Sequence, residues 1–207
     1  MKLIISSTSP YARKIVILIK ELGLESAFQF ETLNPLKHSD ALRKINPLSK
    51  VPALVTASGT LIVNSPVIAR FIDDFAVSEH NKASLTRPSG IKLEQLMSLE
   101  SLCDEMSVSA ILWVMERARP REQQSDHWIN RWQLGINTTL DYIEKIIETN
   151  SSQDETFHLG EIALVCALDY LAFRLGELNW LQQRPHLAAW LAIRHTRTSV
   201  IETKPAE

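Results

Sequence analysis

Two prolines bracket a short polar turn in the stretch Asn46-Pro47-Leu48-Ser49-Lys50-Val51-Pro52, and the apolar run 53–55 follows directly. Proline restricts the residue before it to extended backbone, so Val51 is expected to be extended. Pro52 has no N–H for a strand ladder and therefore fits the first residue of a strand, an edge or a bulge. The pattern predicts a turn that leaves the N–H and C=O of Val51 free to pair with an extended, peptide-like ligand. A plain loop-to-strand junction explains this stretch equally well when it is taken alone.

A candidate anion site follows a short way downstream. The apolar run 61–63 comes after a turn at 57–60, so these segments are expected to form a hairpin. The triplet Asn64-Ser65-Pro66 then precedes apolar residues at helical spacing as far as Phe75. Ser65 suits the N-cap of that helix, and Pro66 suits its first position. Because free N–H groups at a helix start attract a carboxylate, the sequence places an anion site near the Val51 edge.

Together these features resemble the glutathione-binding domain of the glutathione S-transferase superfamily. The resemblance implies that Val51, preceding a cis-proline at Pro52, pairs with the cysteinyl backbone of glutathione. It also implies that Ser65 binds the γ-glutamyl carboxylate, and that glutathione is a co-substrate. Asn64 stands where the family carries Glu or Asp, so we expect a weaker contact to the ammonium group of the ligand.

The composition of the chain limits which cellular compartment and which binding partners are expected. The chain has 207 residues and a net charge of −2, which disfavours a nucleic acid partner because phosphate binding needs a basic surface. Its two cysteines, Cys103 and Cys166, match no metal-binding or disulfide pattern, so no metal and a reducing compartment are expected. The apolar run near the N-terminus is too short for a signal peptide, and none approaches the ~20 residues of a membrane span. The sequence therefore predicts a cytoplasmic protein without a membrane anchor.

The N-terminal third predicts an α/β domain. A strand at 3–5, a buried helix at 11–22 closed by Gly23, and a strand at 28–33 make a βαβ unit. A short helical piece at 39–45, the hairpin and the helix at 66–75 complete the order βαβ-ββα. This order is typical of a thioredoxin-like domain, which we assign to residues 1–78, with an interdomain linker at 79–89.

Residues 90–207 predict an all-helical domain. Helices are expected near 91–119, 125–149, 162–175 and 187–195, and the third is apolar on most sides, as a central buried helix would be. This arrangement resembles the transferase family over nearly the whole chain. His158 replaces the usual Ser or Thr cap of the buried helix, and Glu161 is expected to form the acidic half of a capping box.

The turn before the first helix, Thr8-Ser9-Pro10-Tyr11, matches the position where the family carries its catalytic Ser, Cys or Tyr. A hydroxyl at a helix N-terminus can stabilise a thiolate through a hydrogen bond and the helix dipole. The free thiol has a pKa of about 8.5, so stabilisation of the anion is the chemistry required. We expect Ser9, or else Thr8, to be the catalytic group, with Ser7 a distant third. Helix capping alone is the competing interpretation for these hydroxyls.

Four further residues complete the predicted substrate site. Lys50 is expected to pair with the glycyl carboxylate of glutathione, and Tyr11 to line the electrophile pocket. In the family the long helix faces the active site, so Ile111 and Met115, on one stripe with Asp104 and Ser107, are expected to line it. A solvated lysine, a core tyrosine and a packing stripe are the competing interpretations.

The resemblance implies a glutathione-dependent transferase that activates the thiolate for attack on a small electrophile or a peroxide. The absence of Cys at position 9 disfavours thiol–disulfide exchange by the protein itself. The alternative is a non-catalytic glutathione-binding or regulatory protein with the same fold. A homodimer is expected by resemblance to the family.

Overall fold

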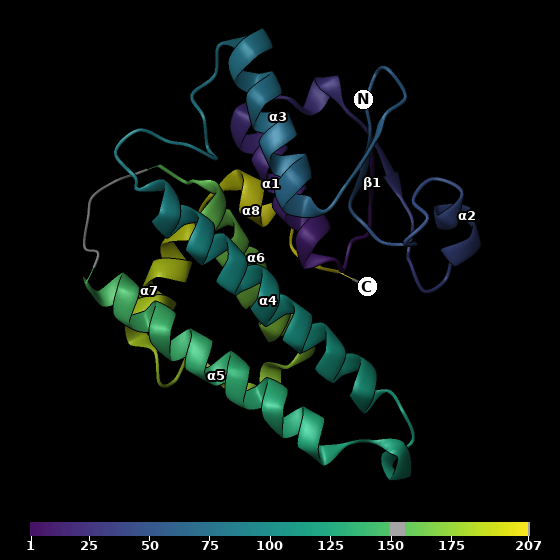
Figure 1. The fold of residues 1–207 in the computed structure, drawn as a ribbon. Helices are drawn as coiled ribbons and strands as arrows, with labels where there is room; N and C mark the ends of the chain where they lie inside the picture. Colours follow the sequence, from purple (N-terminus) through teal and green to yellow (C-terminus); the bar gives the residue numbers. More distant parts are fainter. Residues whose placement is uncertain (150–155, 207) are drawn as a thin grey trace.

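The computed structural model describes residues 1–149 and 156–206, with a small sheet and its helices at the N-terminus (Figure 1). This part consists of β1 (Lys2–Ile5), α1 (Pro10–Leu22), η1 (Glu25–Ala27), β2 (Gln29–Thr32), α2 (Ser39–Arg43), β3 (Ala53–Val55), β4 (Leu61–Val63) and α3 (Ser65–His80). The sheet order is β2-β1-β3-β4, in which β1 is parallel to β2, and β3 is antiparallel to both β1 and β4. The predicted βαβ-ββα order of a thioredoxin-like domain is confirmed.

The remaining elements are all helical, as predicted. They are α4 (Leu93–Arg117), η2 (Arg121–Gln123), α5 (Asp126–Thr149), α6 (Leu159–Arg174), η3 (Gly176–Leu178), α7 (Pro185–Arg194) and α8 (Thr198–Ile201). Helix α6 is buried along nearly its whole length and packs against both α4 and α1, which confirms the expected central helix. The sequence did not predict α8, because four residues are too few for a periodic pattern.

Several helix boundaries differ from the predicted ones. Helix α3 continues past Phe75 to His80, because its polar last turn faces solvent, and Asn81 closes it in the left-handed conformation that Asn tolerates. The connection between the two parts therefore runs over 81–92. Ser65 is the first residue of α3 rather than its N-cap, and Asn64, with φ 74°, holds the cap position.

The predicted caps of the two most buried helices, α1 and α6, agree with the structure to different extents. Gly23 ends α1 at φ 66°, as predicted, and its N–H and that of Leu24 bond the last carbonyls of the helix. His158 caps α6, since its Nδ1 accepts from the N–H of Glu161. The expectation that Glu161 completes a capping box is wrong: its Oε1 accepts instead from Arg194 at 2.6 Å and from Trp190 at 3.2 Å, both on α7.

A buried aspartate fixes the connection between the two parts onto α3. Asp73 is fully buried, and its two oxygens accept hydrogen bonds from the hydroxyls of Ser84 and Thr86 and from the N–H groups of Leu85 and Thr86. Four donors to one carboxylate offset the cost of burying its charge. The segment after α3 is thereby held against the N-terminal part.

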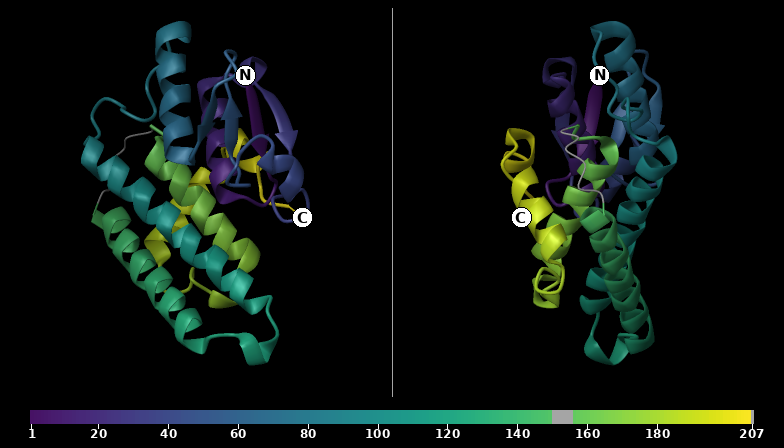
Figure 2. Two further views of the ribbon diagram at one scale, coloured as in Figure 1. Left: turned by 45° about the vertical axis from the view of Figure 1, so that its right-hand side comes forward. Right: turned by 90° about the vertical axis from the view of Figure 1, so that its left-hand side faces the viewer.

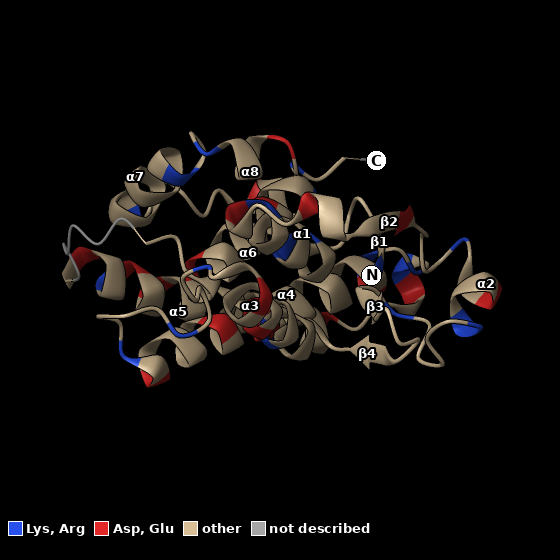
Figure 3. Ribbon diagram, turned by 90° about the horizontal axis from the view of Figure 1, so that it is seen from above, with Lys and Arg blue, Asp and Glu red and all other residues tan. Residues whose placement is uncertain are grey.

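The C-terminal segment returns to α1, where Figure 2 shows it in yellow against the N-terminal part. Arg13 of α1 donates to Asp169 of α6 at 2.7 Å and to the Val200 carbonyl at 3.1 Å. Arg197 and Ser199 bond Glu21 at the far end of α1. Lys and Arg are interspersed with Asp and Glu over both parts (Figure 3). No helix in the described ranges is long and apolar enough to span a bilayer.

Candidate functional site

The strand register gathers the predicted site residues at one edge of the sheet. Ile4 of β1 lies opposite Ala53 of β3, and Ala53 lies opposite Val63 of β4. Since β3 is antiparallel to both neighbours, its start lies beside the ends of β1 and β4. The turn before α1, the 51–52 dipeptide and the start of α3 therefore meet at this edge, although they are far apart in sequence.

Ser9 caps α1 and keeps a proton to donate. Its backbone is extended, its Oγ accepts from the N–H of Ala12 at 3.2 Å, and Pro10 occupies the first helical position. Accepting a hydrogen bond leaves the hydroxyl hydrogen of Ser9 available, because a hydroxyl has one donor and two acceptor sites. The N–H of Tyr11 has no hydrogen bond to any described residue, so it is a second donor at this helix start.

Thr8 lies beside Ser9 but faces a different neighbour. Its Oγ1 is 3.4 Å from the Oγ of buried Ser6, and either atom can be the donor. Thr8 is partly buried, whereas Ser7 is exposed. Both Ser9 and Thr8 therefore stay candidates for the catalytic hydroxyl, and Ser9 has the direct link to the helix N-terminus.

Val51 has the free backbone edge that the sequence predicts. The peptide bond between Val51 and Pro52 is cis, and neither the N–H nor the C=O of Val51 bonds to a described residue. Asn46 holds this turn, a role that the sequence alone did not assign to it. Its side chain is 1% exposed, donates to the Lys50 carbonyl at 2.7 Å and accepts from the N–H of Leu48 at 3.0 Å. The Asx turn that Asn favours before Pro47 is the sequence signal for it.

Ser65 provides two unpaired donors at the start of α3. It is 4% exposed, and neither its N–H nor its hydroxyl bonds to a described residue. The Asn64 carbonyl accepts from the N–H groups of Val67 and Ile68, while the Asn64 side chain is exposed and makes no capping bond. A carboxylate at this position would meet two donors and the positive end of the helix dipole.

Some of the other predicted site residues are exposed, and others already make contacts within the protein. Lys50 is exposed and has no ion pair within the described ranges. The Tyr11 hydroxyl donates to the Asp104 carbonyl at 3.2 Å, so it is not free to face a ligand. Ile111 is partly buried against the core, and Met115 is 54% exposed on the same helix. Ser107 donates to the Cys103 carbonyl at 2.9 Å.

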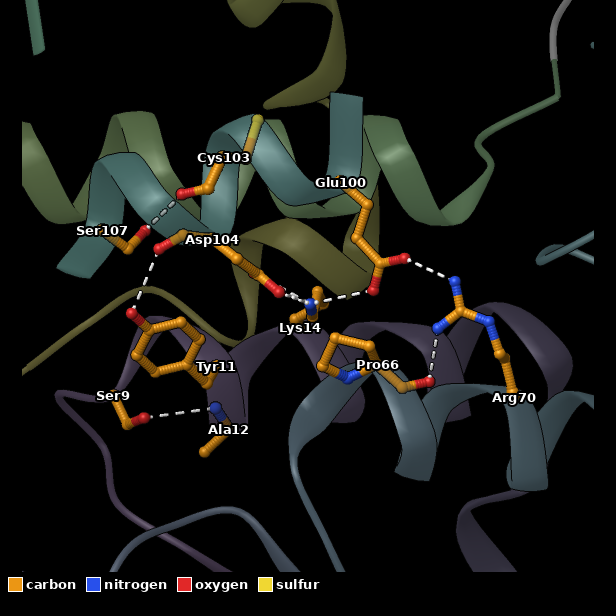
Figure 4. Close-up of polar contacts among 10 residues, drawn as sticks. All are labelled: Ser9, Tyr11, Ala12, Lys14, Pro66, Arg70, Glu100, Cys103, Asp104 and Ser107. Atoms are coloured by element: carbon orange, nitrogen blue, oxygen red, sulfur yellow. Dashed lines mark hydrogen bonds and ion pairs between the residues drawn. The ribbon is translucent and has the colours of Figure 1, made fainter. Parts of the chain in front are cut away.

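A largely buried ionic cluster, which the sequence did not predict, lies directly behind this edge (Figure 4). We call it the Lys14 cluster: Lys14 of α1, Arg70 of α3, and Glu100 and Asp104 of α4. The Lys14 ammonium is 2.7 Å from Asp104 and 3.1 Å from Glu100, and Arg70 reaches Glu100 at 3.2 Å and the Pro66 carbonyl at 2.8 Å. Two positive and two negative groups thus join the starts of α1 and α3 to the long helix.

Burial dominates the titration of the groups around the site. Burial raises the pKa of Asp104, and Lys14 counters part of that increase. Burial and the charge of Asp104 raise the pKa of Tyr11 far above neutral pH, so its hydroxyl stays protonated. Burial also raises the pKa of Cys166 to about 12 and that of Cys103 well above its usual value. Both cysteines are free and buried.

The site has three separate groups that one ligand could contact at the same time. The Val51 edge can pair with an extended backbone, the start of α3 can hold a carboxylate, and the start of α1 can stabilise an anion near Ser9. Among the described residues, no group of His, Cys, Asp and Glu could hold a metal ion.

Comparisons with known protein families cover both parts of the chain. Residues 8–74 match the glutathione S-transferase N-terminal domain, and residues 126–192 match the glutathione S-transferase C-terminal domain. An uncharacterized GST-like protein of Escherichia coli K12, YibF, is 35% identical over 205 residues, which cover 99% of this chain and 98% of that protein.

Solved structures give the same relationship. A glutathione transferase family member from Pseudomonas fluorescens Pf-5 with bound glutathione is 30% identical, with a TM-score of 0.90 over 100% of this chain and 99% of that one. A glutathione S-transferase from Methylobacillus flagellatus KT, also with glutathione bound, is 29% identical, with a TM-score of 0.88 over 99% of each chain.

Proposed function

Because the chain belongs to the glutathione S-transferase superfamily, we propose that it binds glutathione and activates its thiol for transfer to a small electrophile or a peroxide. The observation that carries this proposal is the unpaired backbone of Val51, positioned by the strand register beside the start of α1. Glutathione is a peptide, so its cysteinyl N–H and C=O can add to this edge as a strand would. Glutathione acts here as a co-substrate.

The ends of glutathione would occupy the two sides of this edge. The γ-glutamyl carboxylate would accept from the N–H and hydroxyl of Ser65, and the exposed Lys50 would pair with the glycyl carboxylate. Asn64 can offer an amide oxygen to the ligand's ammonium group, but not a charge. We therefore expect the carboxylate, rather than the ammonium group, to account for most of the polar affinity.

Thiolate stabilisation would come from the start of α1. The Ser9 hydroxyl, polarised by the hydrogen bond from Ala12, would donate to the sulfur, with Thr8 as the second candidate. A hydrogen bond to a charged group is worth about 1.5–3 kcal/mol, which corresponds to about one to two pKa units. Starting from a thiol pKa of about 8.5, that decrease would bring the pKa to about 6.5–7.5, so a substantial fraction of the bound thiol would be ionised at neutral pH.

Transfer, rather than binding alone, is supported by the ligand in a second structure of a relative already described. Another structure of the Pseudomonas fluorescens protein, 29% identical with a TM-score of 0.86, holds S-(propanoic acid)-glutathione, a thioether of glutathione. A thioether has the connectivity that attack of the thiolate on an electrophilic carbon produces. Ile111 and Met115 on α4 would contact the second substrate, beside Tyr11.

Two measurements test the proposal. Calorimetry should show glutathione binding, and a thiol-conjugation assay with an aryl halide should show turnover above the uncatalysed rate. Failure to bind glutathione would remove both the Val51 and the Ser65 assignments. Binding without turnover, on either an aryl halide or a peroxide, would favour the non-catalytic, regulatory alternative.

We also propose a homodimer formed through α3 and α4. Both helices carry exposed apolar side chains, which are Val67 and Val77 on α3 and Leu93, Met97 and Val108 on α4. Light scattering at micromolar concentration should give twice the mass of the chain. The monomer mass would contradict this proposal.

A further inference from the structure

Residues 33–52 carry an excess of positive charge beside the Val51 edge. Four exposed side chains of this segment are cationic and Asp40 is its one carboxylate, so the segment has a formal charge of +3 with histidine neutral. The whole chain has a net charge of −2, and the rest of the molecule therefore carries −5. We call the four cationic side chains the α2 surface: Lys37, Arg43, Lys44 and Lys50.

Packing holds the α2 surface against the Val51 edge. Leu42 of α2 is fully buried and shares a small core cluster with Val51 and with one residue each of β1 and β3. The Ser49 hydroxyl donates to the Ser39 carbonyl at 3.2 Å, which ties the turn before Val51 to the first residue of α2. Lys50 directly precedes Val51 in the same turn. The four cations and the unpaired backbone of Val51 therefore belong to one small packed unit.

Most of the charge of the α2 surface is not compensated by the protein. Arg43 pairs with Asp40 at 2.5 Å, whereas Lys37, Lys44 and Lys50 form no ion pair with any described residue. The arginine-rich stretch 117–121 differs, because each of its three arginines pairs with a carboxylate. A positive field at the binding edge therefore comes from three unpaired ammonium groups.

Such a field raises the affinity for an anion without direct contact. Charges in water act on one another over the Debye length, which is about 10 Å at 0.1 M salt and longer at lower salt. Their interaction energy is proportional to the product of the charges, so a doubly charged ligand gains twice the free energy of a singly charged one. Glutathione with its thiol protonated carries one net negative charge at neutral pH, and its thiolate carries two.

We propose that the α2 surface makes the site selective for the more anionic form of its ligand, and so favours the thiolate of bound glutathione over the thiol. This rests on the proposed function, because it assumes that glutathione lies along the Val51 edge. The thiol proton passes to solvent. Lys37 and Lys44 act through their field rather than by contact, so their effect adds to the hydrogen bond from Ser9 and does not replace it.

The test compares two unreactive glutathione derivatives that differ in charge at the sulfur. S-methylglutathione has one net negative charge, and glutathione sulfonate has two. In calorimetry on the full chain at about 50 mM ionic strength, the double variant Lys37→Glu, Lys44→Glu should weaken binding of the first about threefold and of the second about tenfold. In about 0.5 M salt, both losses should fall below about 1.5-fold. The matched control Lys82→Glu, Lys92→Glu makes the same charge change at exposed lysines outside the α2 surface, and should weaken binding less than about 1.5-fold.

The thiol of bound glutathione gives a second readout. Because the double variant should cost the thiolate about three times more affinity than the thiol, the pKa of the bound thiol should rise by about half a unit with Ser9 intact.

Three outcomes would overturn the inference. Equal losses for the two derivatives, or losses that persist in high salt, would show that the substitutions distort the turn rather than change its field. An equal loss in the control would assign the effect to net charge instead of the α2 surface. If glutathione itself does not bind to the wild type, the proposed function is wrong; if it binds and the double variant keeps both affinities, only this inference is wrong.

Discussion

The sheet edge and the Lys14 cluster lie next to each other, but their polar groups differ in whether they have partners within the protein. At the edge, the backbone of Val51, the donors of Ser65 and the hydroxyl hydrogen of Ser9 have no partners among the described residues. In the Lys14 cluster, the buried ammonium of Lys14, the carboxylates of Glu100 and Asp104 and the partly exposed guanidinium of Arg70 bond one another (Figure 4). Both regions use the starts of α1 and α3.

This contrast distinguishes polar groups that are available to bind a ligand from polar groups that stabilise the fold around the site. Unpaired polar groups near a surface cost little while water reaches them, and they gain hydrogen bonds when a ligand arrives. A buried charge without a partner is strongly destabilising, so each charge of the cluster contributes to stability only while its partners are present. Substitutions at the edge should therefore change binding more than stability, and those in the cluster should do the reverse.

The largest expected effect is on stability, from Lys14→Met. Lys14 is 1% exposed, and its loss leaves Glu100 and Asp104 buried with less compensation. We expect the free energy of unfolding to fall by about 3–5 kcal/mol, as for other broken buried pairs. Urea unfolding measures it. Lys20→Met is the control, because the pair of Lys20 with Glu202 is open to solvent and should be worth less than about 1 kcal/mol. Equal losses in both variants would contradict the distinction.

Ser9→Ala tests the catalytic hydroxyl. Loss of one charge-assisted hydrogen bond should raise the pKa of the bound thiol by about one to two units. Loss of the N-cap should also cost about 1 kcal/mol of stability. Ultraviolet thiolate absorbance of bound glutathione against pH measures the first effect. The comparison variants are Thr8→Ala and, for shape, Thr8→Val.

The outcome at these two positions decides among three donors. A shift only in Thr8→Ala would make Thr8 the catalytic group instead. If neither variant changes the titration, the N–H groups at the start of α1, with that of Tyr11 among them, carry the stabilisation, and no side chain is catalytic.

Ser65→Ala should weaken glutathione binding about tenfold, because it removes one hydrogen bond to the carboxylate and leaves the backbone N–H in place. The free energy of unfolding should change by less than about 0.5 kcal/mol, since this hydroxyl has no partner among the described residues. Calorimetry and urea unfolding on the same samples measure the two effects. A large loss of stability with unchanged affinity would assign Ser65 to the structural groups.

The smallest effect concerns the contact of α8 with α1. Burial raises the pKa of Glu21, but hydrogen bonds from Arg197 and Ser199 outweigh it, and the net pKa is lowered. A carboxyl with a lowered pKa stabilises the fold above its unfolded pKa, near 4.5, and this contribution is lost as the pH falls below that value. Glu21→Gln should therefore lower stability at pH 7 by less than about 1 kcal/mol and flatten its decline between pH 5 and pH 3. An unchanged acid limb would contradict the assignment.

The order of helices and strands was predictable from the sequence because the start or end of each element depends on residues close to it in the chain. The proline before β3, the hairpin turn and Gly23 each specify the backbone of their own neighbourhood, and the buried helices are apolar enough to recognise. Boundaries were less predictable: α3 continues through polar residues to His80, and α8 is too short to leave a pattern. The capping box at Glu161 failed because two residues of α7, far along the chain, compete for its carboxylate.

The site divides in the same way. The sequence by itself determined the groups whose function is local: the extended Val51 before Pro52, Ser9 capping α1, and Ser65 at the start of α3. Only the tertiary structure decided that Lys14 pairs with Glu100, 86 positions away, and that Arg13 pairs with Asp169, 156 positions away. A charged residue in sequence shows no partner, because the partner is chosen by helix packing. A residue before proline or at a helix start, by contrast, has its conformation set by its immediate neighbours.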